Sequence, residues 1–452
     1  MPRFFLWSLI AIVAFAPLPL GSNRPLGWSL LSLEVGVLLV LWAIHHLWTG
    51  QVLPVSVKRI RVPLVLFAVT CAWVLIQLIP NIPFGLAHPA WQELNVFFGS
   101  DMPERITIDP DQTMMFLLRW FAYAGIFWLA LQLGRDRAAA KIALSAFTAV
   151  AAAYALYGLV ALFALGDTLL LYEKWVNKGA ATSTFVNRNT YATFAGLGVI
   201  AATALIMSSR SRQGVPALFS RERLYDLLSH GFTLITFGYL SFFLAATALL
   251  LTGSRAGALS TFAAFLVLVW GLTRRVRAKA KPNIVGFTIF LAVVVGIVSF
   301  SGGFLGARLA SGGDVLRAEN FPRAVVAIED HAFIGSGLGS FPQIFPLYRD
   351  SEALRDRHIA KLHNTYLESA LELGLPAAIC LALAIGLLTW QCWRGMSTRS
   401  RDGHFPAMGF AASILVALHA LVDFSLQIPA IAVAYMFLLG IAVAQSFSSK
   451  RR

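Results

Sequence analysis

The stretch TGSRAGALSTFAAFLVLVWGLTRRVRAKAK (252–281) shows the pattern that decides the fold. A short polar start is followed by an apolar run, and a cluster of arginine and lysine residues ends it. About twenty apolar residues in a helix cross a hydrocarbon core roughly 30 Å thick. Such runs recur along the whole chain, so we predict an all-α polytopic membrane protein with about twelve transmembrane helices and a large outer loop between helices 9 and 10. The expected spans are 4–20, 28–48, 62–80, 112–133, 141–165, 190–208, 230–252, 257–272, 284–301, 369–390, 406–424 and 429–447.

The composition agrees with this fold class. The chain has 452 residues, of which 58% are hydrophobic and 13% are charged, and its mean hydropathy is +0.71. A soluble domain carries about a quarter charged residues, so the composition excludes an ordinary soluble protein. The net charge is +14, but the basic residues fall in short loops between apolar runs, which argues against nucleic acid as a partner. The three cysteines form no CxxC pair and no disulfide pattern.

The basic residues indicate which way the helices run. Most of the 36 lysines and arginines fall in alternate loops, and basic loops stay in the cytoplasm, so we predict that both termini are cytoplasmic. The N-terminal stretch MPRFFLWSLIAIVAFAPLPLGS (1–22) is similar to a signal peptide, but with so many spans after it we expect an uncleaved first helix. The basic segments are Arg3 and residues 58–61, 135–141, 210–223, 273–281, 394–401 and 450–452.

Three of the predicted outer loops are long: 81–111, 166–189 and, above all, 302–368. The last carries acidic and basic residues in near balance, which is typical of a folded, water-facing subdomain. We therefore divide the chain into transmembrane helices 1–9 (1–301), the loop subdomain (302–368) and transmembrane helices 10–12 (369–452).

The large outer loop has internal order of its own. Apolar residues recur at helical spacing over 321–335 and again over 351–363. The glycine-rich segment GSGLGSFP (335–342) between them predicts a turn.

Two arginines stand at the predicted outer ends of inward-running helices. Arg188 precedes span six, where Asn187 or Asn189 can cap the helix, and Arg255 precedes span eight, where Ser254 can do so. A helix N-terminus offers unpaired N–H groups and partial positive charge, and a guanidinium adds a bidentate fork for phosphate oxygens. Two such starts side by side would bind a diphosphate without a metal. Arg255 can instead be a flanking residue whose charged end reaches the membrane interface.

The stretch KLHNTYLESALELGLP (361–376) places polar groups where the largest loop re-enters the membrane. Thr365 and Glu368 have the spacing of a capping box, so we expect Glu368 to secure the helix start. His363 lies on the loop side of that cap, where a neutral imidazole can accept a proton from a hydroxyl nucleophile. Asn364 can orient the ring. A lone histidine is more often structural, and both interpretations stay open.

Other polar features are weaker candidates. The role of Glu372, one turn after the cap, is open. His419 and Asp423, at i and i+4 near the end of span eleven, either support the site or pair with each other. Arg119 within span four needs a partner or water. The segment IDPDQT (108–113) has an Asp-x-Asp pattern known from divalent-ion sites, but before an apolar run we expect a turn and a helix cap.

The order of these motifs resembles the bacterial O-antigen ligase and O-antigen polymerase superfamily. The resemblance covers roughly the C-terminal two-thirds of the chain. In the family pattern an aromatic residue follows the loop arginine, whereas AVVAIED follows Arg323 here, which puts a role for Arg323 in doubt. The matching segments are STFVNRNTYATFAG (183–196), TGSRAGALS (252–260), the Arg323 region with FIGSGLGSFPQIFPLY (333–348), HNTYLESALELGLP (363–376) and LVDFSLQIPA (421–430).

The resemblance implies an integral membrane glycosyltransferase that works on the periplasmic side of the bacterial inner membrane. Such enzymes take a glycan from an undecaprenyl diphosphate carrier and transfer it to a sugar hydroxyl, with inversion and without metal or cofactor. By the resemblance, Arg188 and Arg255 hold the donor diphosphate, and His363 deprotonates or orients the acceptor hydroxyl. The supporting residues would be Asn364, Asn189, Arg323 and Asp423.

The expected function is therefore that of an O-antigen ligase, with lipid A–core as acceptor and membrane lipids as surroundings. A polymerase of the same superfamily, whose acceptor is a second carrier-linked glycan, is the alternative. The twelve-span layout with one large outer loop near the C-terminus favours the ligase. A transporter or flippase is more distant, because it would show charged or broken helices at mid-membrane and two related halves.

Overall fold

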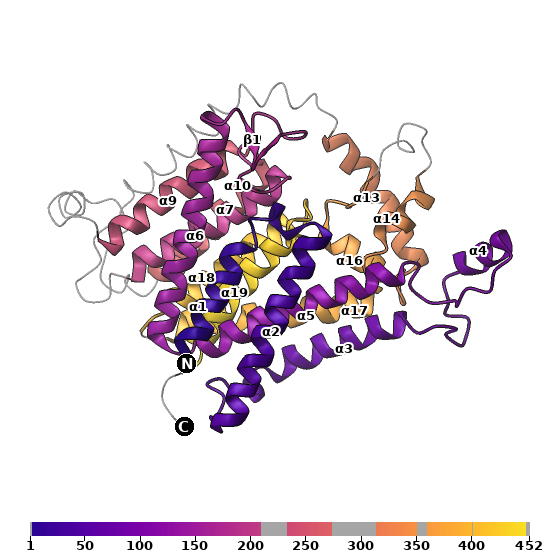
Figure 1. Ribbon diagram of the computed structural model, residues 1–452, viewed down its shortest axis with the longest axis horizontal. Helices are drawn as coiled ribbons and strands as arrows, with labels where there is room; N and C mark the ends of the chain where they lie inside the picture. The colour runs from indigo at the N-terminus through magenta and orange to yellow at the C-terminus, as the bar shows by residue number, and fades with distance from the viewer. Residues whose placement is uncertain (1, 209–232, 274–312, 350–358, 400, 449–452) are drawn as a thin grey trace.

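The computed structural model describes residues 2–208, 233–273, 313–349, 359–399 and 401–448. Within these ranges the chain is mostly helical, and the short strands β1 (Thr168–Leu169) and β2 (Tyr172–Glu173) pair as an antiparallel hairpin (Figure 1). The α-helices are α1 (Pro2–Phe15), α2 (Pro25–Thr49), α3 (Arg61–Gln77), α4 (Ala90–Phe98), α5 (Pro110–Leu133), α6 (Arg137–Phe163), α7 (Arg188–Ser208), α9 (Leu234–Leu251), α10 (Arg255–Thr273), α13 (Gly313–Asp330), α14 (Phe341–Ile344), α16 (Thr365–Leu373), α17 (Leu375–Thr398), α18 (His404–His419) and α19 (Pro429–Ser446). Short 3-10 turns are η1 (Leu20–Ser22), η2 (Val57–Ile60), η3 (Phe345–Tyr348) and η4 (Ser425–Gln427).

Length and apolar composition identify the membrane-spanning elements. In the described part of the chain, nine helices are long and apolar enough to cross a membrane, and the shorter apolar helices α1 and α18 accompany them. The chain is thus a helical, multi-pass membrane protein. The expected span 284–301 lies outside the described residues.

Helices α7 and α19 form the centre of the bundle. In each of these helices, 94% of the most apolar stretch of 18 residues is buried inside the protein, whereas only 22% of the corresponding stretch of α17, at the periphery, is buried. Helix α19 packs on α5 and α18, and α7 packs on α6, α9 and α10. Small residues permit this close approach, since a Cβ atom on Gly440 of α19 would lie 2.7 Å from the Cβ of Ala130 on α5.

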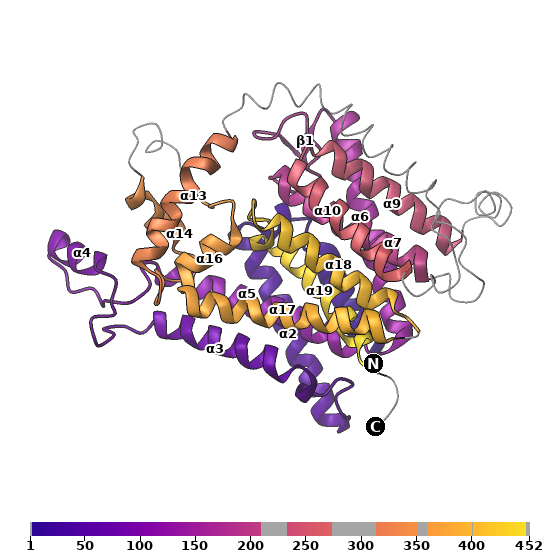
Figure 2. The same ribbon diagram turned by 180° about the vertical axis from the view of Figure 1, so that it is seen from behind.

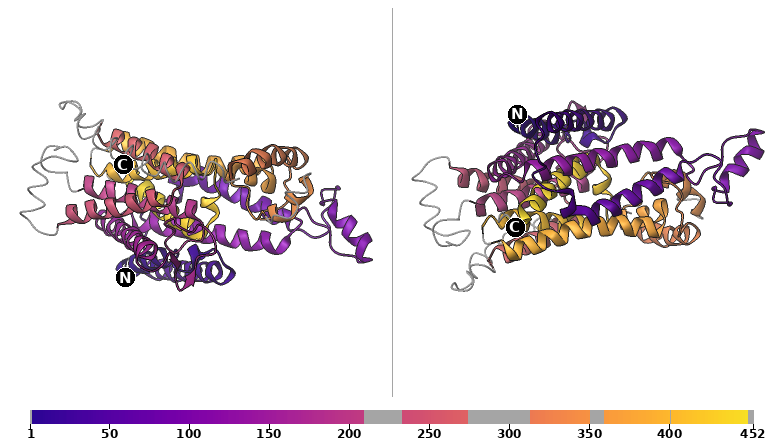
Figure 3. Two further views of the ribbon diagram at one scale, coloured as in Figure 1. Left: turned by 90° about the horizontal axis from the view of Figure 1, so that it is seen from above. Right: turned by 90° about the horizontal axis from the view of Figure 1, so that it is seen from below.

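The two ends of the bundle differ. Helix α1 begins and α19 ends at the same end, and the β1–β2 hairpin lies at the other (Figures 1 and 2). Helix α4, which forms within the long loop 81–111, projects from the bundle far from the start of α1 (Figure 3). An even number of crossings between the two termini is consistent with this placement.

The predicted span 369–390 begins later than expected. Helix α16 ends at Leu373, Gly374 has φ +76° and ψ 156°, and α17 starts at Leu375 with a proline in its first turn. The left-handed φ of the glycine and the missing N–H of the proline break the helix here. The membrane-crossing helix therefore starts at Leu375, and Glu372 lies outside it.

Three further expectations about helices were wrong in part. The predicted span 406–424 ends at His419 as α18, because Asp423 leaves the helix to bind polar partners described below. The predicted helix 351–363 lies mostly outside the described residues, and residues 359–363 are not helical. The predicted helix 321–335 corresponds to α13, which ends at Asp330.

The glycine-rich turn 335–342 is confirmed. Gly335 and Gly337 have φ values of +70° and +107°, which side chains rarely adopt. A Cβ on Gly337 would also lie 2.1 Å from the hydroxyl oxygen of Thr107, so the turn needs glycine for space as well as for conformation. The turn, α13 and α16 share a small apolar core that includes Ala327 and Phe341. The three-part division of the chain stays a prediction.

Candidate functional site

The starts of α7 and α10 are capped by polar side chains, as the sequence indicates. Asn187 Oδ1 accepts hydrogen bonds from the backbone N–H of Asn189 at 2.7 Å and of Thr190 at 3.4 Å. Ser254 Oγ accepts one from the N–H of Gly257 at 3.2 Å. Of the two asparagines considered for α7, Asn187 is the cap, and the side chain of Asn189 is left for another partner.

These two helix starts pack closely against each other. A Cβ on Gly257 of α10 would lie 2.6 Å from the Cβ of Ala192 on α7, and a Cβ on Gly196 would lie 2.3 Å from the hydroxyl oxygen of Thr261. Arg255 and Arg188 open these helices, the first exposed and the second half-buried. The packing therefore brings two partially positive helix ends together, each carrying a guanidinium.

His363 is held in an unusual backbone conformation. Its φ is +62°, in the left-handed region that non-glycine residues rarely enter. Its Nδ1 lies 3.3 Å from Asp423 Oδ1, and its ring meets Phe424 edge-on at 4.7 Å between centroids. The side chain stays 35% exposed, so the ring is held through Nδ1 and is still partly accessible. Such strain persists only where surrounding contacts over-determine it.

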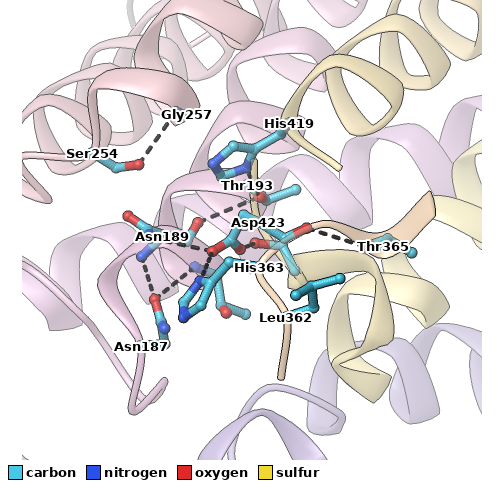
Figure 4. Close-up of polar contacts among 12 residues, drawn as sticks. Asn187, Asn189, Thr193, Ser254, Gly257, Leu362, His363, Thr365, His419 and Asp423 are labelled. Atoms are coloured by element: carbon cyan, nitrogen blue, oxygen red, sulfur yellow. Dashed lines mark hydrogen bonds and ion pairs between the residues drawn. The ribbon is translucent and has the colours of Figure 1, made fainter. Parts of the chain in front are cut away.

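Asp423 connects His363 to the start of α7 (Figure 4). Its carboxylate is fully buried, and Oδ1 also accepts a hydrogen bond from Asn189 Nδ2 at 3.2 Å. Ser425 Oγ donates to Oδ2. Burial raises the pKa of Asp423, but the hydrogen bond from His363, the charge of His419 and the hydrogen bond from Ser425 together hold this pKa below its ordinary value. Asp423 is therefore a carboxylate at neutral pH.

The charge of Asp423 decides which nitrogen of His363 carries the proton. A carboxylate only accepts hydrogen bonds, so the neutral ring donates through Nδ1. Nε2 is then the nitrogen that can accept a proton. This His–Asp pair has the arrangement of a general base with an orienting carboxylate.

The cap of α16 differs from the expected capping box. Asn364, not Thr365, is the N-cap residue, and its Oδ1 accepts hydrogen bonds from the N–H groups of Tyr366 and Leu367 at 3.0 and 3.1 Å. The expectation was wrong by one residue because Thr365 donates its hydroxyl to the backbone carbonyl of Asp423 at 3.1 Å instead. Asn364 thus fixes the backbone next to His363, while Asp423 contacts the imidazole.

Glu368 stabilises the loop that precedes α16, whereas the sequence predicted that it would cap the start of this helix. Its carboxylate accepts hydrogen bonds from Lys361 Nζ at 2.8 Å and from the N–H of Leu362 at 2.9 Å. Thr365 N–H donates to the carbonyl of Ala420 at 2.9 Å. Residues 361–365 are therefore held from both sides, which accounts for the conformation of His363.

Glu372 stabilises the glycine-rich turn. Its Oε1 accepts a hydrogen bond from the N–H of Phe341 at 3.2 Å, at the start of α14. Burial and then the nearby Glu368 raise the pKa of Glu372 to about 7, against the smaller opposing effect of Lys361. This position is structural, because the carboxyl contacts the turn and not the His363–Asp423 pair.

The remaining candidates lie on different elements, and of these His419 is near enough to Asp423 for its charge to lower the pKa of that carboxyl. His419 ends α18, so it does not share a helix face with Asp423, and its Nδ1 lies 2.7 Å from the hydroxyl of Thr193 on α7. Arg323 lies on α13, and in the described part of the chain neither His363 nor Asp423 forms a hydrogen bond with it. The helix-cap interpretation of 108–113 is confirmed, since Asp109 Oδ1 accepts from the N–H of Gln112 at 3.0 Å.

The sequence did not reveal how these groups pair. Asn189 and Asp423 are 234 residues apart in the chain. No sequence pattern indicated that Ser425 would hydrogen-bond to Asp423 or that Thr193 would contact His419. In the described ranges, no three His, Cys, Asp or Glu side chains gather in a way that could hold a metal ion. Metal independence stays a prediction.

Comparison with known protein families finds one similar segment. Residues 240–382 match the family model described as O-antigen ligase, a segment that contains Arg255, the glycine-rich turn and His363. Comparison with curated proteins finds no significant match. The match covers about a third of the chain, and over that segment the chain is similar to the O-antigen ligase and polymerase superfamily.

Proposed function

We propose that this protein is an O-antigen ligase-type glycosyltransferase. It moves a glycan from undecaprenyl diphosphate to a hydroxyl of lipid A–core on the periplasmic side of the inner membrane. The family match supports glycan transfer rather than transport. The observation that carries the proposal is the buried Asp423, which joins His363 to Asn189 in the first turn of α7, next to Arg188.

The donor diphosphate would lie against the paired starts of α7 and α10. Backbone N–H groups in the first turns and the guanidinium groups of Arg188 and Arg255 are all donors, and both helix dipoles present their positive ends. As the bond between the anomeric carbon and the diphosphate oxygen breaks, negative charge grows on the leaving diphosphate. These preorganised donors stabilise that charge, so no protonation of the leaving group is required.

The acceptor hydroxyl would be activated by His363. As its oxygen attacks the anomeric carbon from the face opposite the diphosphate, Nε2 of His363 takes the hydroxyl proton. Asp423 stabilises the imidazolium that forms, and attack from the opposite face inverts the anomeric configuration. The proton is later released from Nε2 to solvent, since the His363 side chain is partly exposed.

Reconstituted transfer tests the proposal. Purified protein in lipid nanodiscs is given carrier-linked glycan together with either lipid A–core or a second carrier-linked glycan. Product on lipid A–core supports a ligase, and lengthened glycan on the carrier identifies a polymerase instead. Movement of the donor across vesicles without any product would refute glycosyl transfer, and loss of activity with a chelator would refute the metal-free mechanism.

A further inference from the structure

Arg119 is a buried guanidinium on α5, outside the site described above. The residue is only 5% exposed. Its guanidinium carbon lies 3.6 Å from the ring centroid of Trp28, in the first turn of α2, and 4.3 Å from that of Phe116. Helical side chains point toward the N-terminus of their helix, so Arg119 reaches toward the end of α5 that begins at Pro110.

This positive charge has no counter-ion among the residues that the structure describes. Among the described residues, none forms a hydrogen bond or an ion pair with Arg119, and its Nε is buried without a partner. One turn further along the same helix, the hydroxyl of Tyr123 is also buried without a hydrogen-bond partner in the described part of the chain. Aromatic faces compensate only a small part of the desolvation of a charge, and a buried unpaired group is costly. Two such groups on one helix face indicate a missing polar ligand.

The neighbouring cation Lys361 shows the contrast. Lys361 Nζ lies 4.9 Å from the ring centroid of Phe116, but it is already paired with Glu368 at 2.8 Å. Arg119 therefore keeps the uncompensated charge. Because Lys361 is two residues before His363, Arg119 lies near the catalytic segment.

The position of Arg119 differs from that of the donor site. Just before α16, His363 is joined through Asp423 to Asn189 on α7, whereas Lys361 contacts Phe116 on α5. The donor diphosphate is assigned to α7 and α10. A second anionic group near His363 would thus approach from the α5 and α2 side.

We propose that Arg119 binds a phosphate on the lipid anchor of the acceptor. This inference rests on the proposed function, in which two membrane-anchored glycolipids meet at His363. A guanidinium offers a bidentate fork that matches phosphate oxygens, and the Trp28 and Phe116 rings hold its plane in place. Both acceptor types, lipid A–core and a polyprenyl diphosphate glycan, carry phosphate where their apolar chains begin. Tyr123 supplies an additional hydroxyl donor.

Binding of phosphorylated lipid, measured without turnover, tests the site. Full-length protein in detergent is titrated with lipid A and with enzymatically dephosphorylated lipid A, and the ligand-dependent rise in Tm gives the affinity. We expect Arg119→Gln to weaken binding of phosphorylated lipid A about tenfold or more, the effect of losing a charge-assisted hydrogen-bonded pair. Dephosphorylated lipid A should bind wild type and Arg119→Gln equally. Equal binding of phosphorylated lipid A by both proteins would overturn the proposal.

Matched variants separate binding from folding. Arg24→Gln removes an exposed arginine just before α2 and should leave phosphate binding unchanged. Without ligand, Arg119→Gln should unfold at the wild-type temperature or above, because it removes an unpaired buried charge. Arg119→Lys keeps the charge but loses the bidentate fork, so it should bind phosphorylated lipid A more weakly than wild type. Wild-type affinity in Arg119→Lys together with a sharp fall in Tm of Arg119→Gln would indicate a structural role and refute the site.

A second arm identifies the source of the phosphate. Undecaprenyl diphosphate is titrated against protein carrying Arg255→Ala, which weakens the donor site, with and without Arg119→Gln. If only the affinity for undecaprenyl diphosphate depends on Arg119, the acceptor is carrier-linked. If only the affinity for lipid A depends on Arg119, the protein is a ligase. If lipid binding depends on Arg119 but the protein catalyses no transfer, the proposed function is refuted and the phosphate site is supported. Transfer with wild-type acceptor KM in Arg119→Gln would refute the site and leave the proposed function standing.

Discussion

Replacing Asp423 by asparagine isolates the charge of the His–Asp pair. Asparagine has nearly the same shape, and its oxygen can still accept from His363 and Asn189 while its amide faces the hydroxyl of Ser425. The fold should therefore persist. In the proposed mechanism, what is lost is the negative charge that stabilises the imidazolium formed when His363 takes the acceptor proton.

The size of the effect follows from the geometry. Nδ1 of His363 and Oδ1 of Asp423 are 3.3 Å apart. Unit charges at that separation attract by about 5 kcal/mol at an effective dielectric constant of about 20, and by about 1.3 kcal/mol at that of water. Because 35% of the His363 side chain is exposed, screening by solvent places the loss at about 2 to 3 kcal/mol. At about 1.36 kcal/mol per factor of ten, kcat should fall about 30- to 150-fold.

The assay is steady-state transfer in nanodiscs, with thermal unfolding measured on the same samples. Asp402→Asn is the matched control, because the Asp402 side chain is only 6% exposed and pairs with Arg137 at 2.6 Å, but Asp402 precedes α18 at the other end of that helix. Asp402→Asn should keep the wild-type kcat. His363→Ala should cost about 10²- to 10⁴-fold as a lost general base. Full activity in Asp423→Asn, or equal losses in Asp423→Asn and Asp402→Asn, would refute the role assigned to the pair.

Three further predictions concern helix packing, pH and the donor. Gly257→Ala should lower stability by about 1 to 3 kcal/mol through overpacking, seen as a lower Tm and a reduced kcat. Gly36→Ala, with open space around it inside α2, should leave kcat unchanged and should not lower Tm, because alanine favours the helix over glycine. Glu372 has a folded-state pKa of about 7, above the ordinary 4.5, so its contribution to stability is fully present below pH 4.5 and is lost as the pH rises toward 7. Glu372→Gln should therefore flatten the pH dependence of Tm between pH 4.5 and 8. An unchanged slope would contradict the assignment. Arg188→Lys and Arg255→Lys keep the charge but lose the bidentate fork, so each should raise the donor KM about tenfold and leave the acceptor KM unchanged; a change confined to the acceptor KM would place the diphosphate elsewhere.

The sequence was informative where short-range physics decides the outcome. Apolar runs long enough to cross a membrane predicted the helices, and the caps at Asn187 and Ser254 predicted where α7 and α10 begin. The same local logic was wrong at α16, where both Asn364 and Thr365 can cap. A tertiary contact from Thr365 to the backbone of Asp423 decided between them.

By itself, the sequence determined a multi-span helical membrane protein with Arg188, Arg255 and His363 at helix starts, because hydrophobic length and capping depend on neighbouring residues. Only the tertiary structure decided that Asp423 orients His363, across 60 residues, and that Arg119 is left without a counter-ion among the described residues. The reason is physical: which polar groups pair across a bundle depends on how its helices pack. That packing is set by contacts between small residues on helices far apart in the chain.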